Sequence, residues 1–304
     1  MLAVNNLRYE YPGVTALADI QFQIPPQSIV AVVGPNGAGK TTLFRCLACL
    51  EAPFSGEVRI DGILSTEDPR KCHRLIGFLP DMFGLFEELT VEQSLRYFAQ
   101  AAKTPEPQSL ALQVAQRIGL AHKLSARVSE LSRGMRQRLG IGQLLVKSPR
   151  ILILDEPAAG LDPDARAELS VLLRSLRDQG LTLVVSSHIL TELQEYADRM
   201  IVLENGKILS DVGTGAGQST RTAALHLEVE TSVERASDLA KHLQSLECTV
   251  LLQDQGTLRA RTPWTREQAR QIMHDLIVDN QYPLYQFQIR ELDLQEEYRH
   301  ALRK

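Results

Sequence analysis

The fold of this chain is decided by residues 28–41, which read SIVAVVGPNGAGKT. The first six residues form a near-continuous apolar run of strand length, and the remainder is a glycine-rich loop that opens a helix at Lys40. The loop fits the pattern G-x-x-x-x-G-K-[ST], which between a strand and a helix is typical of a phosphate-binding loop. A chance glycine turn is the alternative, and it does not account for the motif and its setting together.

Each residue type in this loop has a physical reason. Glycines allow the backbone to curl until several N–H groups point at phosphate oxygens, and the helix that follows adds partial positive charge. The Lys40 ammonium would reach the β- and γ-phosphates, and the Thr41 hydroxyl would ligate Mg²⁺. The predicted ATP-binding residues are Gly34, Pro35, Asn36, Gly37, Ala38, Gly39, Lys40, Thr41 and Thr42.

A second apolar run ends in two acidic residues, in the stretch LILDEP at 152–157. Asp155 at the strand end can hold Mg²⁺ through an oxygen, directly or through water. Neighbouring side chains at a strand end diverge, so Glu156 can face an attacking water as a general base. An Asp-Glu-Pro turn that caps the next helix is the simpler alternative for these residues taken alone.

Apolar runs and helical patterns alternate from Met1 to about Val212. The runs at 28–33, 151–154 and 181–187 are almost continuously apolar, which predicts strands of a sheet covered on both faces and hence α/β layering. The N-terminal part alternates instead and predicts an antiparallel edge beside that sheet. Residues 80–147 lose strand signals and predict a helical subdomain, while the Asn-Gly pair within 202–209 predicts a hairpin.

The rest of the chain predicts a second, smaller domain. Residues 213–222 are rich in Gly, Ser and Thr and read as a linker. Residues 223–304 then give the order βαββαβ and a last helix near the C-terminus, which predicts a ferredoxin-like α+β fold. The expected division is therefore 1–212, 213–222 and 223–304.

Composition excludes several classes of protein. A formal charge of -4, from 33 basic and 37 acidic residues, gives no reason to expect nucleic acid as a partner.

Four cysteines in 304 residues are too few for a disulfide scaffold and fit a reducing compartment. Two of them, Cys46 and Cys49, form a CxxC inside a predicted helix and read as core thiols. The N-terminus shows no signal-peptide pattern, and no apolar run is long enough to cross a bilayer.

The motifs taken together resemble the ATP-binding subunits of ABC transporters. The shared features, in order, are GPNGAGKTT (34–42), LSRGM (131–135), LILDEP (152–157), GLD (160–162) and SSH (186–188). The resemblance covers about residues 1–211 and implies a P-loop NTPase fold of ABC type, with a mixed sheet core. It also implies that two such subunits, identical or homologous, face each other head to tail around two ATP molecules.

In that family the LSRGM stretch is the signature that grips the ATP held by the opposite subunit. The resemblance therefore implies contacts in trans for Ser132, Arg133, Gly134 and Met135. The usual signature is LSGGQ, so Arg133 and Met135 are departures, and a solvated arginine is the simpler expectation for Arg133. Without the family, Ser132 reads as a helix cap.

Four further positions follow by match to the family. Tyr11 matches the aromatic residue that stacks on adenine, His188 the switch histidine that contacts the γ-phosphate, and Asp162 the carboxylate that couples the two sites. Taken alone, Tyr11 could be an ordinary strand aromatic, and a lone histidine such as His188 could be structural. Asp81 stands where the family usually has Gln, and we expect it to keep an oxygen contact with Mg²⁺ and to change turnover.

The stretches IGFLPD (76–81) and LSRGMRQRLG (131–140) resemble one branch in particular, the ATP subunits of exporters that pair with a separate integral membrane permease. This predicts a peripheral protein at the cytoplasmic face of a membrane. Met82, Phe83, Leu85 and Phe86 read either as an exposed docking patch for that permease or as core residues of the helical subdomain. A regulatory or maturation ATPase at a membrane complex is the alternative function.

Overall fold

A computed structural model of the chain describes residues 1–187, 190–213, 225–246, 248–254, 256–262, 264, 266–278 and 282–291. The chain forms two compact units, Met1–Gly217 and Gln218–Lys304. Most of the predicted linker, residues 214–222, lies outside the described residues, and so does the predicted last helix.

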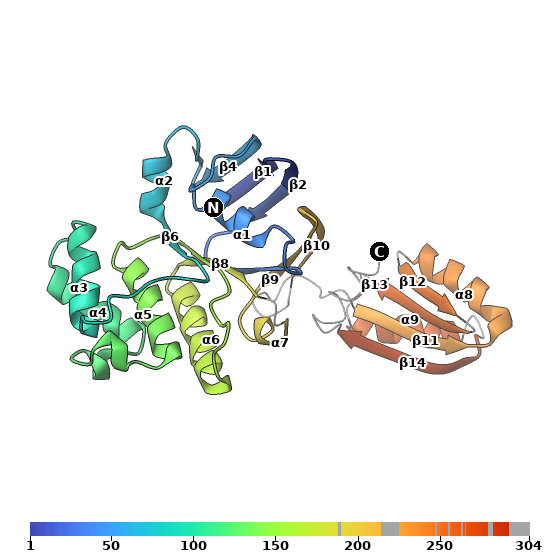
Figure 1. Cartoon of the computed structure of the whole chain (residues 1–304). Helices are drawn as coiled ribbons and strands as arrows, with labels where there is room; N and C mark the ends of the chain where they lie inside the picture. The colour runs from blue at the N-terminus through green and yellow to red at the C-terminus, as the bar shows by residue number, and fades with distance from the viewer. Residues whose placement is uncertain are drawn as a thin grey trace. The chain divides into compact units, whose positions relative to one another are not determined.

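The strands of the first unit form two sheets (Figure 1). Their bounds are β1 (Leu2–Tyr11), β2 (Val14–Ile24), β3 (Ile29–Val33), β4 (Ser55–Ile60), β5 (Ile63–Leu64), β6 (Ile76–Leu79), β7 (Ile151–Leu154), β8 (Thr182–Ser186), β9 (Arg199–Glu204) and β10 (Lys207–Gly213). One sheet has the order β10-β9-β3-β8-β7-β6, in which only β10 runs antiparallel to its neighbour. This confirms the mixed sheet core.

The three almost continuously apolar runs form central strands of this mixed sheet. Every residue of β3, β7 and β8 is buried, because the sheet is covered on both faces. The expected antiparallel part is present as a sheet of its own, with the order β2-β1-β4-β5. At the far edge of the mixed sheet, Asn205 and Gly206 join β9 to β10 with φ of 48° and 73°, the positive values that a type I′ turn requires.

The helices of the first unit are α1 (Lys40–Leu47), α2 (Pro69–Leu75), α3 (Val91–Ala101), α4 (Pro107–Arg117), α5 (Arg133–Leu145), α6 (Pro163–Asp178) and α7 (Leu190–Leu193), with short 3-10 turns at Ala121–Lys123 and Val128–Glu130. Helices α3, α4 and α5 pack together as the helical subdomain (Figure 1). In the described part of the chain, no helix combines the length and the hydropathy needed to cross a membrane.

Helix α1 lies between the two sheets. One apolar core joins Leu43, Phe44 and Leu47 of this helix to residues of both sheets, such as Leu7 and Val32. Burying a large apolar side chain stabilises a fold by about 1.5–3 kcal/mol. The helix that follows the phosphate loop is therefore held rigidly from two sides, which positions the loop.

The second unit contains β11 (Leu225–Thr231), α8 (Val233–Ser245), β12 (Thr249–Asp254), β13 (Thr257–Thr262), α9 (Arg266–Val278) and β14 (Leu284–Glu291). Its antiparallel sheet has the order β12-β13-β11-β14. A separate core of Leu227, Val229, Leu239, Leu258 and Trp264 lies between the sheet and the helices. Naming this unit ferredoxin-like stays a prediction.

Candidate functional site

The glycine-rich loop curls between the end of β3 and the start of α1. Gly37 and Gly39 have φ of 80° and 104°, values that other residues rarely adopt. Gly34 is required for a different reason, because a Cβ there would lie 2.1 Å from the carbonyl oxygen of Leu203. The loop therefore keeps its shape through two residues in the left-handed region and one close backbone approach.

The Lys40 side chain reaches back over this loop. It is buried, and its Nζ donates hydrogen bonds to the carbonyl oxygens of Gly34 at 2.7 Å and Pro35 at 3.4 Å. The same Nζ lies 3.8 Å from Oε1 of Glu156. The ammonium thus sits where the loop and the acidic strand end meet.

Asp155 joins three elements at the carboxyl edge of the mixed sheet. Its Oδ2 accepts a hydrogen bond from the Thr41 hydroxyl at 2.8 Å, and its Oδ1 accepts one from the Ser186 hydroxyl at 2.6 Å. Ser186 in turn accepts a bond from the backbone N–H of Glu156 at 2.7 Å. Parallel strands end at the same edge of a sheet. Asp155 therefore meets Ser186, which is 31 positions away in the sequence, and Thr41, which is 114 positions away.

Glu156 has a strained backbone. Its φ is 48°, in the left-handed region, which costs about 1–2 kcal/mol for a residue with a Cβ. Such residues concentrate at functional sites, where the surrounding structure over-determines them. The N–H bond to Ser186 and the ion pair with Lys40 are two such restraints, and they aim the carboxylate at the loop.

The predicted magnesium ligands are partly brought together. The Thr41 hydroxyl and the Asp155 carboxylate are adjacent oxygen donors of the kind Mg²⁺ prefers, so they fit the ion. Asp81 is exposed two residues beyond the end of β6, and among the described residues it makes no hydrogen bond or ion pair. Among the described residues, Asp81 is therefore not joined to Thr41 or Asp155 by any hydrogen bond.

Tyr11 lies beside the phosphate loop, at the end of β1. Its hydroxyl is 3.5 Å from Oγ1 of Thr42, and its ring makes an edge contact with Tyr9 at 5.1 Å between centroids. The ring itself is 42% exposed, so it can receive a base. The pKa of Tyr9 is raised, first by its hydrogen bond to Glu51, which holds that ring in place beneath Tyr11.

The LSRGM stretch lies elsewhere. Ser132 caps α5, and its hydroxyl accepts a bond from the N–H of Met135 at 3.3 Å. A Cβ on Gly134 would lie 2.7 Å from Cβ of Ala165, and Asp162 caps α6 through the N–H of Ala165 at 2.7 Å. Within the described chain, no hydrogen bond or ion pair joins residues 132–135 to residues 34–42.

Arg133 is exposed, as expected of a solvated arginine, but it also has a neighbour in the same chain. Its guanidinium lies against Gly160, where a Cβ would be 2.6 Å from Cζ. Gly160 has a φ of 67° and stands two residues before Asp162. Arg133 therefore connects the LSRGM and GLD stretches of one chain.

The sequence analysis assigned no role to one residue of the site, Ser186. Another predicted site residue, His188, lies outside the described residues, so its role stays a prediction. Ser186 belongs to the SSH stretch that the sequence analysis singled out, but it was given no role there, and it binds both Asp155 and the backbone of Glu156.

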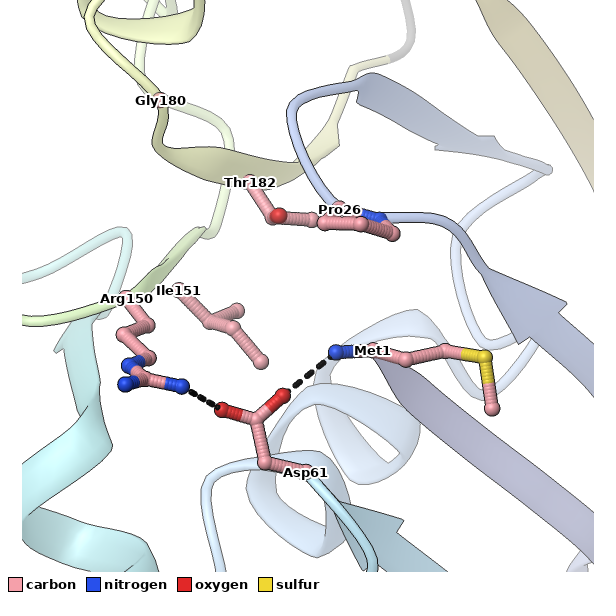
Figure 2. Close-up of a pocket in the computed structure, with 7 residues that line it drawn as sticks. All are labelled: Met1, Pro26, Asp61, Arg150, Ile151, Gly180 and Thr182. Carbon is pink, nitrogen blue, oxygen red and sulfur yellow. Dashed lines mark hydrogen bonds and ion pairs between the residues drawn. The ribbon is translucent and has the colours of Figure 1, made fainter.

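A cavity of about 270 Å³ lies at the amino-terminal ends of the central strands of the mixed sheet, away from the phosphate loop. Figure 2 shows Pro26, Ile151 and Thr182 around it, at or near the starts of β3, β7 and β8. Its charged groups are already paired: Asp61 accepts from the amino group of Met1 at 2.5 Å and from Arg150 at 2.6 Å. This arrangement ties the antiparallel sheet to the mixed sheet.

The CxxC cysteines are thiols of the core. Cys46 is buried, Cys49 is half-buried, and neither is in a disulfide. Burial raises the pKa of each thiol to about 12, which disfavours the reactive thiolate. The expectation that both lie in one helix is wrong, because α1 ends at Leu47 and Cys49 has a φ of 58° beyond its end, but burial supports the interpretation of the pair as packing residues.

Comparison with known proteins gives a family match. The family model described as "ABC transporter" matches residues 17–159. The sulfate/thiosulfate import ATP-binding protein CysA of Synechocystis sp. is 39% identical over 70% of this chain, which spans only 60% of that relative. The phosphonates import ATP-binding protein PhnC 1 of Ruegeria sp. is 34% identical, with 69% of this chain matched to 88% of it.

An export protein is among the relatives as well. The Nod factor export ATP-binding protein I of Rhizobium etli is 34% identical over 66% of this chain and 64% of its own length. Of the solved structures, cbiO1 from Clostridium perfringens, part of the complex cbiONQ, has a TM-score of 0.66, 31% identity and coverage of 70% and 88%. The cassette MJ0796, a dimer bound to ADP and Pi, has a TM-score of 0.64 and 26% identity over 71% of this chain and all of that one.

Proposed function

The chain belongs to the ABC transporter family as an ATP-binding subunit with ATPase activity, and we propose that two copies of it, or one copy and a homologous subunit, close around two ATP molecules to drive a separate membrane permease. One observation supports this most directly. The phosphate loop, Asp155 and Glu156 are assembled within one chain, while residues 132–135 contact residues 160–165 instead. A second polypeptide is then needed to bring a signature to the triphosphate.

Each residue at the loop has a role in this proposal. The backbone of residues 34–42 binds the phosphates, Lys40 turns from its carbonyl partners to the γ-phosphate, and Tyr11 stacks on the base, worth about 1–3 kcal/mol. Thr41 and Asp155 hold Mg²⁺, which neutralises charge on the triphosphate when bound. Glu156 accepts the proton of the attacking water, with His188 and Asp81 beside it.

Residues 132–135 act on the nucleotide of the partner copy. The N-terminus of α5 is a donor of N–H groups with a favourable dipole for an anion, and Ser132 stands at it. Arg133 and Asp162 lie on the same face of the chain, through the contact at Gly160 and the cap at Ala165. ATP then joins two chains, and its hydrolysis removes the bond between them.

Complementation between two inactive variants tests the shared site. Lys40→Ala removes the loop cation and Ser132→Glu places a negative charge where the signature meets phosphate. In a mixed dimer one site carries both defects and the other carries none. We expect each variant alone to lose ATP hydrolysis and an equimolar mixture to recover about a quarter of wild-type activity on statistical grounds.

Ser125→Glu provides the matched control, since Ser125 is also an exposed serine and precedes helix α5 in the sequence. It should hydrolyse ATP as the wild type does. Full activity of the Ser132→Glu variant alone, or no recovery in the mixture, would contradict a site shared between two copies.

The permease side of the proposal rests on residues 82–86 and on the resemblance to the exporter branch. Met82 is 89% exposed and Phe86 is 52% exposed, while Phe83 packs on Gly140 and Leu85 is half-buried. Phe86 makes an edge contact with Tyr97, also exposed, at 5.4 Å between ring centroids. An exposed apolar surface of this kind fits an apolar helix of a membrane subunit, which would hold the chain at the cytoplasmic face.

Copurification with the membrane protein encoded beside this chain tests the docking surface. Met82→Glu should abolish copurification and any stimulation of ATP hydrolysis by that protein. Phe54→Glu changes another exposed apolar residue, 71% exposed and away from the helical subdomain, and should leave both unchanged. Equal effects of the two variants would contradict the assigned surface. Export itself is tested in inside-out vesicles, where ATP added outside should drive cargo into the lumen.

A further inference from the structure

Tyr9 supports the ring of Tyr11 on β1. The two residues are two positions apart, and their rings make an edge contact with centroids 5.1 Å apart and 71° between the ring planes. Aromatic pairs prefer a geometry of this kind. Tyr9 is half-buried and packs against the core of the first unit, whereas Tyr11 is exposed. The ring that can receive a base therefore rests against a ring that is anchored in the core.

Polar contacts restrain the side chain of Tyr11 only weakly. Its hydroxyl is 3.5 Å from Oγ1 of Thr42, which is long for a hydrogen bond between two hydroxyl groups. No other hydrogen bond joins that hydroxyl to the described part of the chain. An exposed aromatic side chain rotates about two torsions, and only some of its orientations present a face to a bound base. The contact with Tyr9 is therefore the main restraint on how Tyr11 is oriented.

The hydroxyl of Tyr9 is itself held by a carboxylate. It donates a hydrogen bond to Oε2 of Glu51 at 3.0 Å, while Oε1 of Glu51 accepts one from Nη2 of Arg45 at 2.8 Å. Hydrogen bonds to ionised groups are stronger than those between neutral groups. The bond to Glu51 is also the first cause of the raised pKa of Tyr9, so the phenol keeps its proton and remains a donor. Tyr9 is thus fixed at its ring by the core and at its hydroxyl by Glu51.

The backbone around Glu51 is tied down on both sides. The N–H groups of Leu50 and Glu51 donate to the carbonyl oxygen of Arg45 at 2.9 and 3.3 Å. Three residues further on, the N–H of Phe54 donates to the carbonyl oxygen of Arg8, the residue before Tyr9, at 2.8 Å. The segment 50–54 therefore joins the end of α1 to β1, and the carboxylate of Glu51 has a defined place between them.

Helix α1 connects this arrangement to the phosphate loop. The helix begins with Lys40 and Thr41, and Arg45 lies in its last turn. Its first turn faces the place where phosphates bind, and its last turn holds Glu51, which holds Tyr9. One rigid element therefore sets both the phosphate contacts and the orientation of the ring that meets the base.

We propose that Tyr9 is a positioning residue of the nucleotide site: its bond to Glu51 fixes it relative to α1, and its ring fixes the orientation in which Tyr11 receives the base. The inference rests on the proposed function, because it requires that Tyr11 stacks on the base. A ring oriented before binding spares the nucleotide part of the cost of ordering the site. If that orientation becomes less populated, the apparent dissociation constant rises in the same proportion.

Tyr9→Phe tests this in the full chain, because it keeps the ring and removes the hydroxyl. Binding is measured for a non-hydrolysable ATP analogue and for inorganic tripolyphosphate, which has phosphates and no base. We expect the dissociation constant of the analogue to rise about two- to fivefold, the effect of losing one hydrogen bond that holds the ring. That of tripolyphosphate should not change. In the ATPase assay KM should rise by the same factor as the first constant, while kcat changes less than about twofold.

Two further variants sharpen the result. Glu51→Ala removes the other end of the same bond and should give the same pattern. The double variant of Tyr9→Phe and Glu51→Ala should lose no more affinity than Glu51→Ala alone, and additive losses would overturn the pairing. Glu57→Ala is the matched control: it removes a glutamate that pairs with Arg59 on β4 at 2.8 Å, and it should change neither dissociation constant.

Tyr11→Ala separates this inference from the function on which it rests. In that background Tyr9→Phe should have no further effect, since it acts only through the ring of Tyr11. A further loss there, or weaker binding of tripolyphosphate, would overturn the inference, because Tyr9 would then act by a structural route. A loss in Tyr11→Ala and none in Tyr9→Phe would overturn the inference alone. Unchanged binding of the analogue by Tyr11→Ala would overturn the stacking role in the proposed function and this inference with it.

Discussion

Thr41 and Asp155, 114 residues apart, are joined by a hydrogen bond of 2.8 Å from the threonine hydroxyl to Oδ2 of the carboxylate. The bond connects the helix of the phosphate loop to the end of β7. It also places two hard oxygen donors side by side, which is the arrangement a small divalent cation needs.

Asp155→Asn should weaken the affinity of the ATPase for Mg²⁺. The amide keeps the shape of the carboxylate and loses its charge, so the concentration of Mg²⁺ for half-maximal ATP hydrolysis should rise about 10- to 100-fold. Titration of the ATPase rate with Mg²⁺ measures this. Ser186→Ala, which leaves the charge and removes one bond to it, should cause a smaller rise, and equal effects would contradict the role of the charge.

Gly34→Ala should destabilise the protein more than Gly37→Ala. At position 34 a Cβ would lie 2.1 Å from a backbone carbonyl oxygen, so the strands themselves must move, at a cost of about 2–3 kcal/mol. At position 37 nothing lies within 4 Å, and only the φ of 80° opposes alanine, at about 1 kcal/mol. Urea unfolding midpoints measure both, and the reverse order would contradict the close approach at Leu203.

Cys46 and Cys49 should resist alkylation in the folded protein. A thiol whose pKa is about 12 is ionised to only about one part in 10⁴ at pH 8, and burial adds a barrier to access. Iodoacetamide labelling followed by mass spectrometry should therefore modify them only in denaturant. Ser125→Cys offers an exposed reference thiol, and labelling of Cys46 at the rate of that thiol would contradict the packing role.

Asp61 should contribute stability only above acidic pH. The hydrogen bond from the amino group of Met1, and then that from Arg150, lower the pKa of this carboxyl. Its contribution is present above the ordinary value of about 3.9 and is lost as the pH falls through the lower value of the folded state. Asp61→Asn should lower the free energy of unfolding at pH 7 by up to about 1 kcal/mol.

The deciding observation is how the difference in stability between wild type and Asp61→Asn depends on pH. The difference in Tm between wild type and Asp61→Asn should begin to shrink as the pH falls below about 3.9 and should continue to shrink as the pH is lowered further. Arg150→Gln removes the second partner and should show a smaller loss over the same pH range. A difference between Asp61→Asn and wild type that stays constant from pH 7 to pH 3 would contradict the ion-pair explanation.

Much of the first unit was predictable because its signals are local. The strand–loop–helix around Lys40, the buried strand at 151–154 and the Asn-Gly hairpin each depend on residues within a few positions of one another. The αβ alternation then predicted α/β layering, and the ordered motifs implied the family and its mixed sheet. Ser132 was correctly placed at the start of a helix, because a cap is also a local device.

Other features could not be read from the sequence because they depend on register and layering. Ser186 meets Asp155 only because β8 pairs with β7 in one register, and Arg133 meets Gly160 only because α5 packs near the start of α6. The amino acids of these pairs carry no mark of their partners. Nothing in the sequence around Glu51 indicated that its carboxylate would accept a hydrogen bond from Tyr9.

The sequence by itself determined which residues would be strand, loop or helix around the phosphate site, since apolar periodicity, glycine and caps act over a few residues. Tertiary structure alone decided how the ends of β3, β7 and β8 align, and so which oxygens and which ammonium share one edge of the sheet. The physical reason is that hydrogen-bond register and side-chain packing join residues more than a hundred positions apart, and only the folded chain brings them within bonding distance.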